Sequence, residues 1–162
     1  MLALKVATNA VRVHGDQSVL PLEQYEHVAC FALLSSDDID PASEFFHYLS
    51  QVFEKNTDIA YLNADISDEE LDAYLKDTAD AQCVIFAVFA KARAYAGTVG
   101  IDDRLVAATQ KLRRDRPTVA VLFGNPYLDE CLNADVTVRC FSDSKPSRGA
   151  ACLALTQKSI NL

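Results

Sequence analysis

The sequence predicts an α/β fold, a flavodoxin-like three-layer sandwich around a mainly parallel sheet of about five to six strands. Its apolar runs are continuous rather than alternating, which is typical of parallel strands buried on both faces. These runs alternate with segments of helical periodicity, as βαβ units require. The length of 162 residues, with 50% hydrophobic and 23% charged residues, suits one globular domain over residues 1–162.

Five apolar runs predict the strands of this sheet. They are rich in valine, isoleucine, phenylalanine and alanine, and they cover residues 27–34, 59–62, 83–89, 118–123 and 134–141. The run from Cys83 to Phe89 is the most hydrophobic of them. We therefore expect it at the centre of the sheet.

Amphipathic helices are expected between and after these strands. Asp40-Pro41 supplies a cap and a proline at the first helical position, ahead of an apolar stripe. Ser67 and Glu70 have capping-box spacing and open a second helix. A third helix over residues 105–112 ends in a basic cluster, which suits the negative end of the helix dipole. The last helix begins near Ser144-Lys145-Pro146.

The first 26 residues have a less regular pattern than the rest of the chain. Val6-Ala7, Val11 and Val13 predict an extended or edge segment. From there, Val19-Leu20-Pro21-Leu22 leads into the first central strand. The sequence contains no repeat or linker that would indicate a second domain.

The net charge of −8 argues against a nucleic-acid partner, because binding to phosphates requires a basic surface. Residues 1–90 hold sixteen acids and four bases, whereas residues 91–162 hold seven acids and eleven bases. Two interpretations stay open. Acidic helices come first in the chain, or the surface is bipolar and its basic side docks an acidic partner.

The cysteines and the apolar runs indicate a protein of a reducing compartment, with the cytoplasm favoured. The five cysteines are odd in number and lack C-x-x-C spacing, and three of them lie in or beside apolar runs. The longest apolar run, residues 83–90, is too short to span a bilayer, which takes about 20 residues. With no signal-peptide pattern at the start, we expect no membrane partner.

Several kinds of site are excluded by what the loops lack. Asp37-Asp38 would suit a phosphoacceptor domain, but the required carboxylate is missing at residues 89–91. The same two acids would repel a flavin phosphate, and the chain has no dinucleotide fingerprint, Walker loop or nucleophile elbow, so we expect no cofactor. His14, His27 and His47 are scattered, and we expect no metal site.

Two loops after predicted strands are the candidates for contact with a ligand or partner, because ligands of open parallel sheets bind at the carboxyl ends of the strands. The loop over residues 89–100 contains two cations, a tyrosine and two glycines, and residues 123–127 read Phe-Gly-Asn-Pro-Tyr. Arg93 could donate to a sugar hydroxyl or a carboxylate, and Tyr95 could stack on a sugar face. The candidate contact residues of the two loops are Lys91, Arg93, Tyr95, Asn125 and Tyr127.

In order and spacing, the segments resemble the C-terminal α/β sandwich domain of family-three glycoside hydrolases, in the β-N-acetylglucosaminidase-like branch. The likeness spans nearly the whole chain. Its most specific parts are Phe123-Gly124-Asn125-Pro126-Tyr127 and the Ser-x-Ser-x-Pro-Ser pattern at residues 142–147. The other matching parts are residues 10–13, 20–22, 84–90, 93–100 and 148–151, together with residues 119–122 and 128 on either side of the Phe-Gly-Asn-Pro-Tyr run.

This resemblance implies an accessory domain rather than a complete enzyme. In that family the nucleophilic aspartate and, in this branch, the acid/base stand on an N-terminal barrel. A barrel of about 250 residues does not fit into this chain, so no catalytic residue is assigned here. The implied role is to pack on such a barrel and to contribute a loop to the carbohydrate cleft. The partners would be the barrel or further copies of the chain.

A second interpretation is a stand-alone flavodoxin-like module that binds a small molecule or a protein. It predicts a concave pocket at the two loops with Arg93 pointing inward, whereas a flat apolar patch at that edge would favour docking on a barrel. An independent hydrolase would need a nucleophile with a base beside it, or two carboxyl groups about 5 Å apart. The sequence offers no such assignment.

Overall fold

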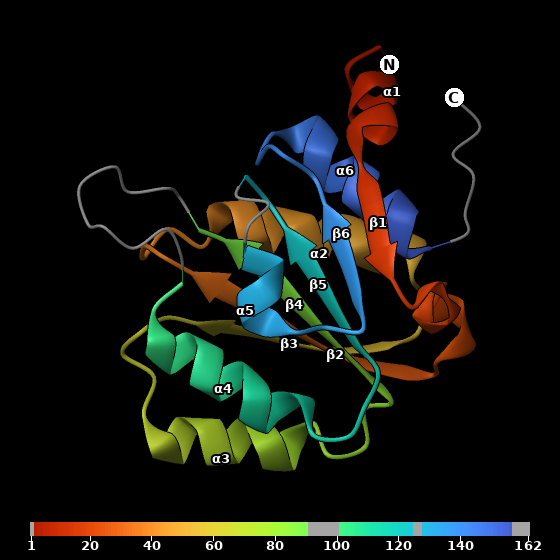
Figure 1. The fold of residues 1–162 in the computed structure, drawn as a ribbon. Helices are drawn as coiled ribbons and strands as arrows, with labels where there is room; N and C mark the ends of the chain where they lie inside the picture. Colours follow the sequence, from red (N-terminus) through yellow and green to blue (C-terminus); the bar gives the residue numbers. More distant parts are fainter. Residues whose placement is uncertain (1, 91–100, 125–127, 157–162) are drawn as a thin grey trace.

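The computed structural model describes residues 2–90, 101–124 and 128–156 (Figure 1). The helices of the described part are α1 (Leu2–Ala10), α2 (Asp40–Val52), α3 (Asp68–Asp77), α4 (Asp103–Arg113), α5 (Asp129–Leu132) and α6 (Lys145–Leu155). The strands are β1 (Arg12–Gly15), β2 (His27–Leu34), β3 (Asn56–Leu62), β4 (Cys83–Phe89), β5 (Thr118–Leu122) and β6 (Val136–Arg139). Two short 3₁₀ turns connect β1 to β2.

The strands form one six-stranded sheet in the order β1-β6-β5-β4-β2-β3. All pairs are parallel except β1 with β6, which is antiparallel. The parallel part has the 2-1-3-4-5 order of flavodoxin-like folds. The fold class is thereby confirmed, and the most apolar strand, β4, lies inside the sheet between β5 and β2 as expected.

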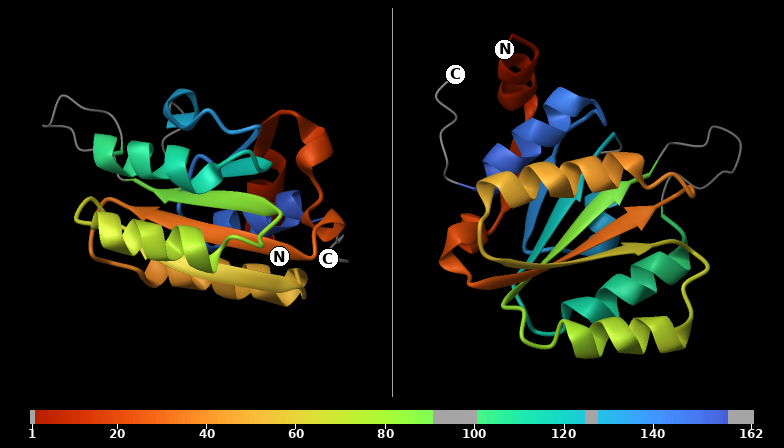
Figure 2. Two further views of the ribbon diagram at one scale, coloured as in Figure 1. Left: turned by 90° about the horizontal axis from the view of Figure 1, so that it is seen from below. Right: turned by 180° about the vertical axis from the view of Figure 1, so that it is seen from behind.

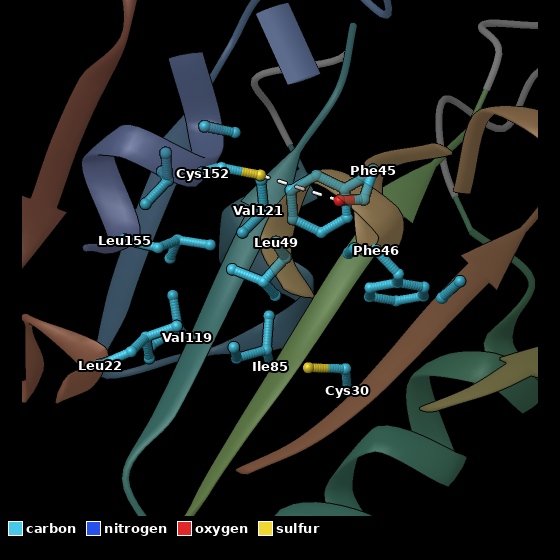
Figure 3. Close-up of a cluster of buried hydrophobic side chains, with 14 of the residues drawn as sticks. Leu22, Cys30, Phe45, Phe46, Leu49, Ile85, Val119, Val121, Cys152 and Leu155 are labelled. Atoms are coloured by element: carbon cyan, nitrogen blue, oxygen red, sulfur yellow. Dashed lines mark hydrogen bonds between the residues drawn. The ribbon is translucent and has the colours of Figure 1, made fainter. Parts of the chain in front are cut away.

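Helices cover both faces of the sheet and make three layers. Figure 2 shows α2 on one side and α3 with α4 on the other. Alternate residues of β4 point to opposite faces, so Ile85 packs with α2 and α6, and Phe86 packs with α3 and α4. Figure 3 shows the first of these two cores, where Phe45 and Cys152 meet above the sheet.

The start of the chain differs from the prediction. The expected edge strand exists around Val13, but Val6-Ala7 lies in helix α1 rather than in an extended segment. The reason is tertiary packing: Leu4 and Ala7 are three residues apart, share one helical face, and are the partly buried residues of α1. Leu4 lies against Gly149 of α6, a contact between distant segments that local periodicity could not reveal.

Two predicted helix starts have different outcomes. The capping box at Ser67 and Glu70 is confirmed, with the Ser67 hydroxyl and the Glu70 carboxylate each accepting a hydrogen bond from the other residue's N–H. The prediction for Asp40 is off by one residue, because Asp40 is already helical and Ile39 occupies the cap position. The carboxylate of Asp38 accepts the hydrogen bond from the Asp40 N–H instead.

Two arginines that follow α4, Arg114 and Arg116, stabilise the fold. Arg116 donates hydrogen bonds to the carbonyl oxygens of Thr78, Ala81 and Leu112, and thereby joins the ends of α3 and α4. Arg114 donates to the carbonyl of Leu75. Both arginines thus complete helix ends.

We expect Arg116→Met to lower the free energy of unfolding by about 2–3 kcal/mol, because four carbonyl groups, the fourth being that of Arg113, lose a charged donor. Arg114→Met, which removes a single exposed bond, is the matched control and should cost less than about 1 kcal/mol. Urea denaturation of the two variants measures the difference. Equal losses would show that the Arg116 contacts do not stabilise the helix ends.

Candidate functional site

The candidate site is the carboxyl edge of the sheet, where the parallel strands end together. All five predicted contact residues (Lys91, Arg93, Tyr95, Asn125 and Tyr127) lie outside the described residues, and their roles stay predictions. The structure does describe where their two loops begin. Phe123 N–H donates to the carbonyl of Val88 at 3.1 Å, and a Cβ added to Gly124 would lie 3.9 Å from the carbonyl oxygen of Ala90. The loops therefore start side by side.

An aromatic cluster of Phe45, Phe89 and Phe123 packs where these two loops begin. The rings of Phe89 and Phe123 stack with centroids 4.7 Å apart. Phe45 of α2 meets Phe123 edge-on at 5.3 Å and lies 6.3 Å from Phe89. All three side chains are buried. One helix residue thus fixes the bases of both loops by dispersion and aromatic contacts.

An ion-pair network lies at the same edge and joins α2 to α6. The buried guanidinium of Arg148 donates to Glu44 Oε2 at 2.7 Å and to Asp143 Oδ1 at 2.8 Å. Tyr48 Oη donates to Glu44 Oε1 at 2.9 Å, and Lys145 Nζ lies 3.6 Å from the same oxygen. Sequence reasoning did not find this network. The signals were the spacing of Glu44 and Tyr48 by one helical turn and an arginine in the first turn of the last helix.

The network keeps Glu44 ionised. The hydrogen bond from Tyr48, followed by the charges of Arg148 and Lys145, lowers the pKa of Glu44 below its ordinary value of 4.5. A carboxylate held in this form is unsuited to donate a proton to a leaving group near neutral pH. The chemistry of Glu44 is therefore that of an ion-pair partner that ties two helices together.

This shift predicts a pH-dependent contribution to stability. Because the folded-state pKa of Glu44 is lowered, its contribution is present above pH 4.5 and is lost as the pH falls through the folded-state value. We expect the difference in unfolding free energy between wild type and Glu44→Gln to shrink between pH 7 and pH 3. Urea denaturation across this range measures it. A difference independent of pH would mean that the Glu44 charge does not stabilise the fold.

Thiol and metal chemistry find little support in the described part of the chain. Burial raises the pKa of Cys83, Cys140 and Cys152 to about 12, and it raises the pKa of Cys30 as well. Thiolate nucleophiles require the opposite shift. Within residues 2–90, 101–124 and 128–156, histidines, cysteines and acids form no group of three that could hold a metal ion. In the same ranges no helix is long and apolar enough to cross a membrane.

A groove of about 620 Å³ lies at the opposite, amino edge of the sheet. Its charged lining is balanced, with three arginines from the end of α4 and three aspartates. The lining residues are Asp16, Val19, Gln110, Arg113, Arg114, Asp115, Arg116, Pro117, Asn133 and Asp135. Arg113 donates to the carbonyl of Asn133 and lies 3.7 Å from Asp135. The charge of Arg113 is thus paired within the protein, and the groove does not have the excess of positive charge that an anion site needs.

Comparisons with known proteins find matches by structure but none by sequence. No protein-family profile matches the sequence, and no curated protein matches it significantly. Solved structures do match. A glycoside hydrolase family 3 β-N-acetylglucosaminidase from Paenibacillus sp. str. FPU-7 superposes on 95% of this chain with a TM-score of 0.69 and 10% identity. The chain has the fold of one part of this glycosidase.

Two further structures agree with this assignment. The β-glucoside phosphorylase BglX matches 96% of the chain with a TM-score of 0.64 and 12% identity. The β-N-acetylglucosaminidase from Thermotoga maritima matches 94% with a TM-score of 0.60 and 13% identity. The chain spans only 29–31% of the length of these three proteins. The resemblance drawn from the sequence is confirmed at the level of the fold, and each of the matched proteins extends well beyond it.

Proposed function

We propose that this chain is the accessory α/β domain of a β-N-acetylglucosaminidase-like glycoside hydrolase. One observation supports the proposal above all: nearly all of this chain superposes on about three tenths of a glycosidase. Residues 1–162 would form this single domain, and a catalytic barrel would supply the nucleophile. The domain would pack on the barrel and contribute a loop of its carboxyl edge to the carbohydrate cleft.

The charge state of Glu44 supports an accessory role. A retaining glycosidase needs one carboxyl group that is protonated near neutral pH and a second about 5 Å away. Glu44 and Asp143 are both bound by Arg148, and the pKa of Glu44 is lowered rather than raised. The two carboxylates that Arg148 binds at the candidate edge therefore have a structural task.

The partner can be tested through the coding sequence around the chain. We expect a barrel of about 250 residues to be encoded in the same reading frame or by a neighbouring gene. Co-expressed with that barrel, the chain should copurify with it and raise its rate on an aryl N-acetylglucosaminide. A barrel that is fully active and monodisperse without the chain would contradict the accessory role.

We also propose a reducing, cytoplasmic location. All five cysteines are free, four of them are buried, and Cys131 is exposed. A protein of an oxidising compartment would more often pair its cysteines in disulfides. Alkylation of the protein isolated from its native cells should modify Cys131 completely. A Cys131 found oxidised or in a mixed disulfide would contradict this location.

A further inference from the structure

Phe141 differs from every other phenylalanine of the chain. The other seven are at most 9% exposed, whereas Phe141 is 50% exposed. Its backbone is left-handed, with φ of 59°. A bulky residue rarely adopts this conformation, because Cβ crowds the following carbonyl group. Strain of this kind persists only where the surroundings enforce it, and it concentrates at ligand-contacting sites.

The surroundings of Phe141 do enforce its position. Directly before it, Cys140 N–H donates to the carbonyl of Leu122 at 3.0 Å and extends the register of β6. After it, Ser144 N–H donates to the hydroxyl of Ser142 at 3.1 Å. Arg148 Nη1 then holds Asp143 twice, through the carbonyl oxygen at 2.6 Å and Oδ1 at 2.8 Å.

Arg148 is itself fixed, because its side chain is only 7% exposed and its other terminal nitrogen binds Glu44 of α2. The loop is thus anchored to two helices and to the sheet. An aromatic ring presented on such a loop loses little conformational entropy when it binds a ligand.

We propose that the Phe141–Ser144 loop is a carbohydrate-contacting loop, in which the ring of Phe141 stacks on the apolar face of a pyranose. The inference rests on the proposed function and names the substrate class of the same edge. The loop follows β6 at the carboxyl end of the sheet, where the strand beside it, β5, leads into the predicted loop at residues 123–127.

The polarity of the loop matches a sugar better than a protein partner. Ser142 and Lys145 follow the ring and are exposed, while the hydroxyl of Ser144 caps α6. Hydroxyl and ammonium groups beside an aromatic face suit a ligand that combines an apolar face with a rim of hydroxyls. Docking of a protein would favour a contiguous apolar surface around the anchor.

Nuclear magnetic resonance of the full chain tests this proposal, with N,N′-diacetylchitobiose as the probe. The Phe141 ring signal, assigned by its loss in Phe141→Tyr, should shift saturably in the millimolar range. Phe141→Asn removes the ring but tolerates the left-handed backbone, so it should fold and bind at least fivefold more weakly. Ile59→Asn alters an apolar side chain of similar exposure, 43%, on the edge strand β3 and should leave binding unchanged.

Two more variants distinguish the contribution of the Phe141 ring from that of the Arg148 contacts that anchor the loop. Phe141→Tyr keeps the aromatic face and should bind within twofold of wild type, as followed by the remaining loop signals. Arg148→Met keeps the ring but releases Asp143, so binding should weaken while thermal unfolding stays cooperative.

A Phe141 signal that does not move with the sugar, or undiminished binding by Phe141→Asn, would overturn the proposal. A signal that moves only with protein concentration would overturn it in favour of self-association. These outcomes are independent of the barrel experiment, so the loop assignment can fail while the accessory role stands.

Discussion

Of the three glycines in the described part of the chain, Gly15 is expected to be the one whose replacement by alanine costs the most stability. Gly15 ends β1 with φ of +104°, and a Cβ there would lie 2.2 Å from the carbonyl oxygen of Asp135. That oxygen already accepts a hydrogen bond from Asp16 N–H at 2.8 Å, so the backbone cannot withdraw without cost. We expect a loss of about 2–5 kcal/mol in the free energy of unfolding, measured by urea denaturation.

Two other glycines provide matched controls for this prediction. Gly124 also has a positive φ of +96°, but the nearest atom to its added Cβ is 3.9 Å away. Gly124→Ala should therefore cost only the backbone strain of roughly 1–2 kcal/mol. Gly149 is helical and meets only the flexible end of Leu4 at 3.3 Å, so alanine there should change stability by less than about 1 kcal/mol. A loss at Gly15 no larger than that at Gly124 would contradict the proposed close contact with Asp135.

Truncation of Phe45 to alanine is expected to loosen both candidate loops at once. Phe45 is fully buried and contacts Phe89, the last residue of β4, and Phe123, which directly follows β5. Removal of a buried phenylalanine ring costs about 3–5 kcal/mol, from lost transfer energy and from the cavity left behind. Denaturation measures the total loss, and amide hydrogen exchange at Val88 to Ala90 and at Phe123 measures the local effect.

Phe141→Ala is the matched control, since it removes the same ring from a half-exposed position. It should change global stability far less than Phe45→Ala and leave exchange at the loop bases unaltered. If Phe45→Ala lowered global stability but left the exchange pattern uniform, Phe45 would belong to the general core and would not control the loops in particular.

The fold was predictable because each signal for it is local. Continuous apolar runs such as Cys83–Phe89 identify parallel strands, and the Ser67 capping box identifies a helix start, without knowledge of any distant contact. Helix α1 was not predictable in the same way. Its residues are mostly exposed, and its helical state depends on Leu4 packing against Gly149, which lies 145 positions further along the chain.

The location of the candidate site could be predicted from the sequence, but only some of its residues could. Parallel strands require their carboxyl ends to meet, so the location follows from the order of elements alone. The Arg148 network was harder to predict, because Glu44 and Arg148 are 104 positions apart in the sequence. The exposure of Phe141 could not be predicted either, since a phenylalanine at the end of an apolar run is more often buried.

Hydrolysis of an aryl N-acetyl-β-glucosaminide by the purified chain tests the central claim most directly. If the chain is an accessory domain whose nucleophile and acid lie on a partner barrel, the rate should not exceed the enzyme-free rate at any pH between 4 and 8. Turnover by the chain alone that Glu44→Gln abolishes would contradict the claim, because it would make Glu44, to which we assign a structural role, a catalytic carboxylate.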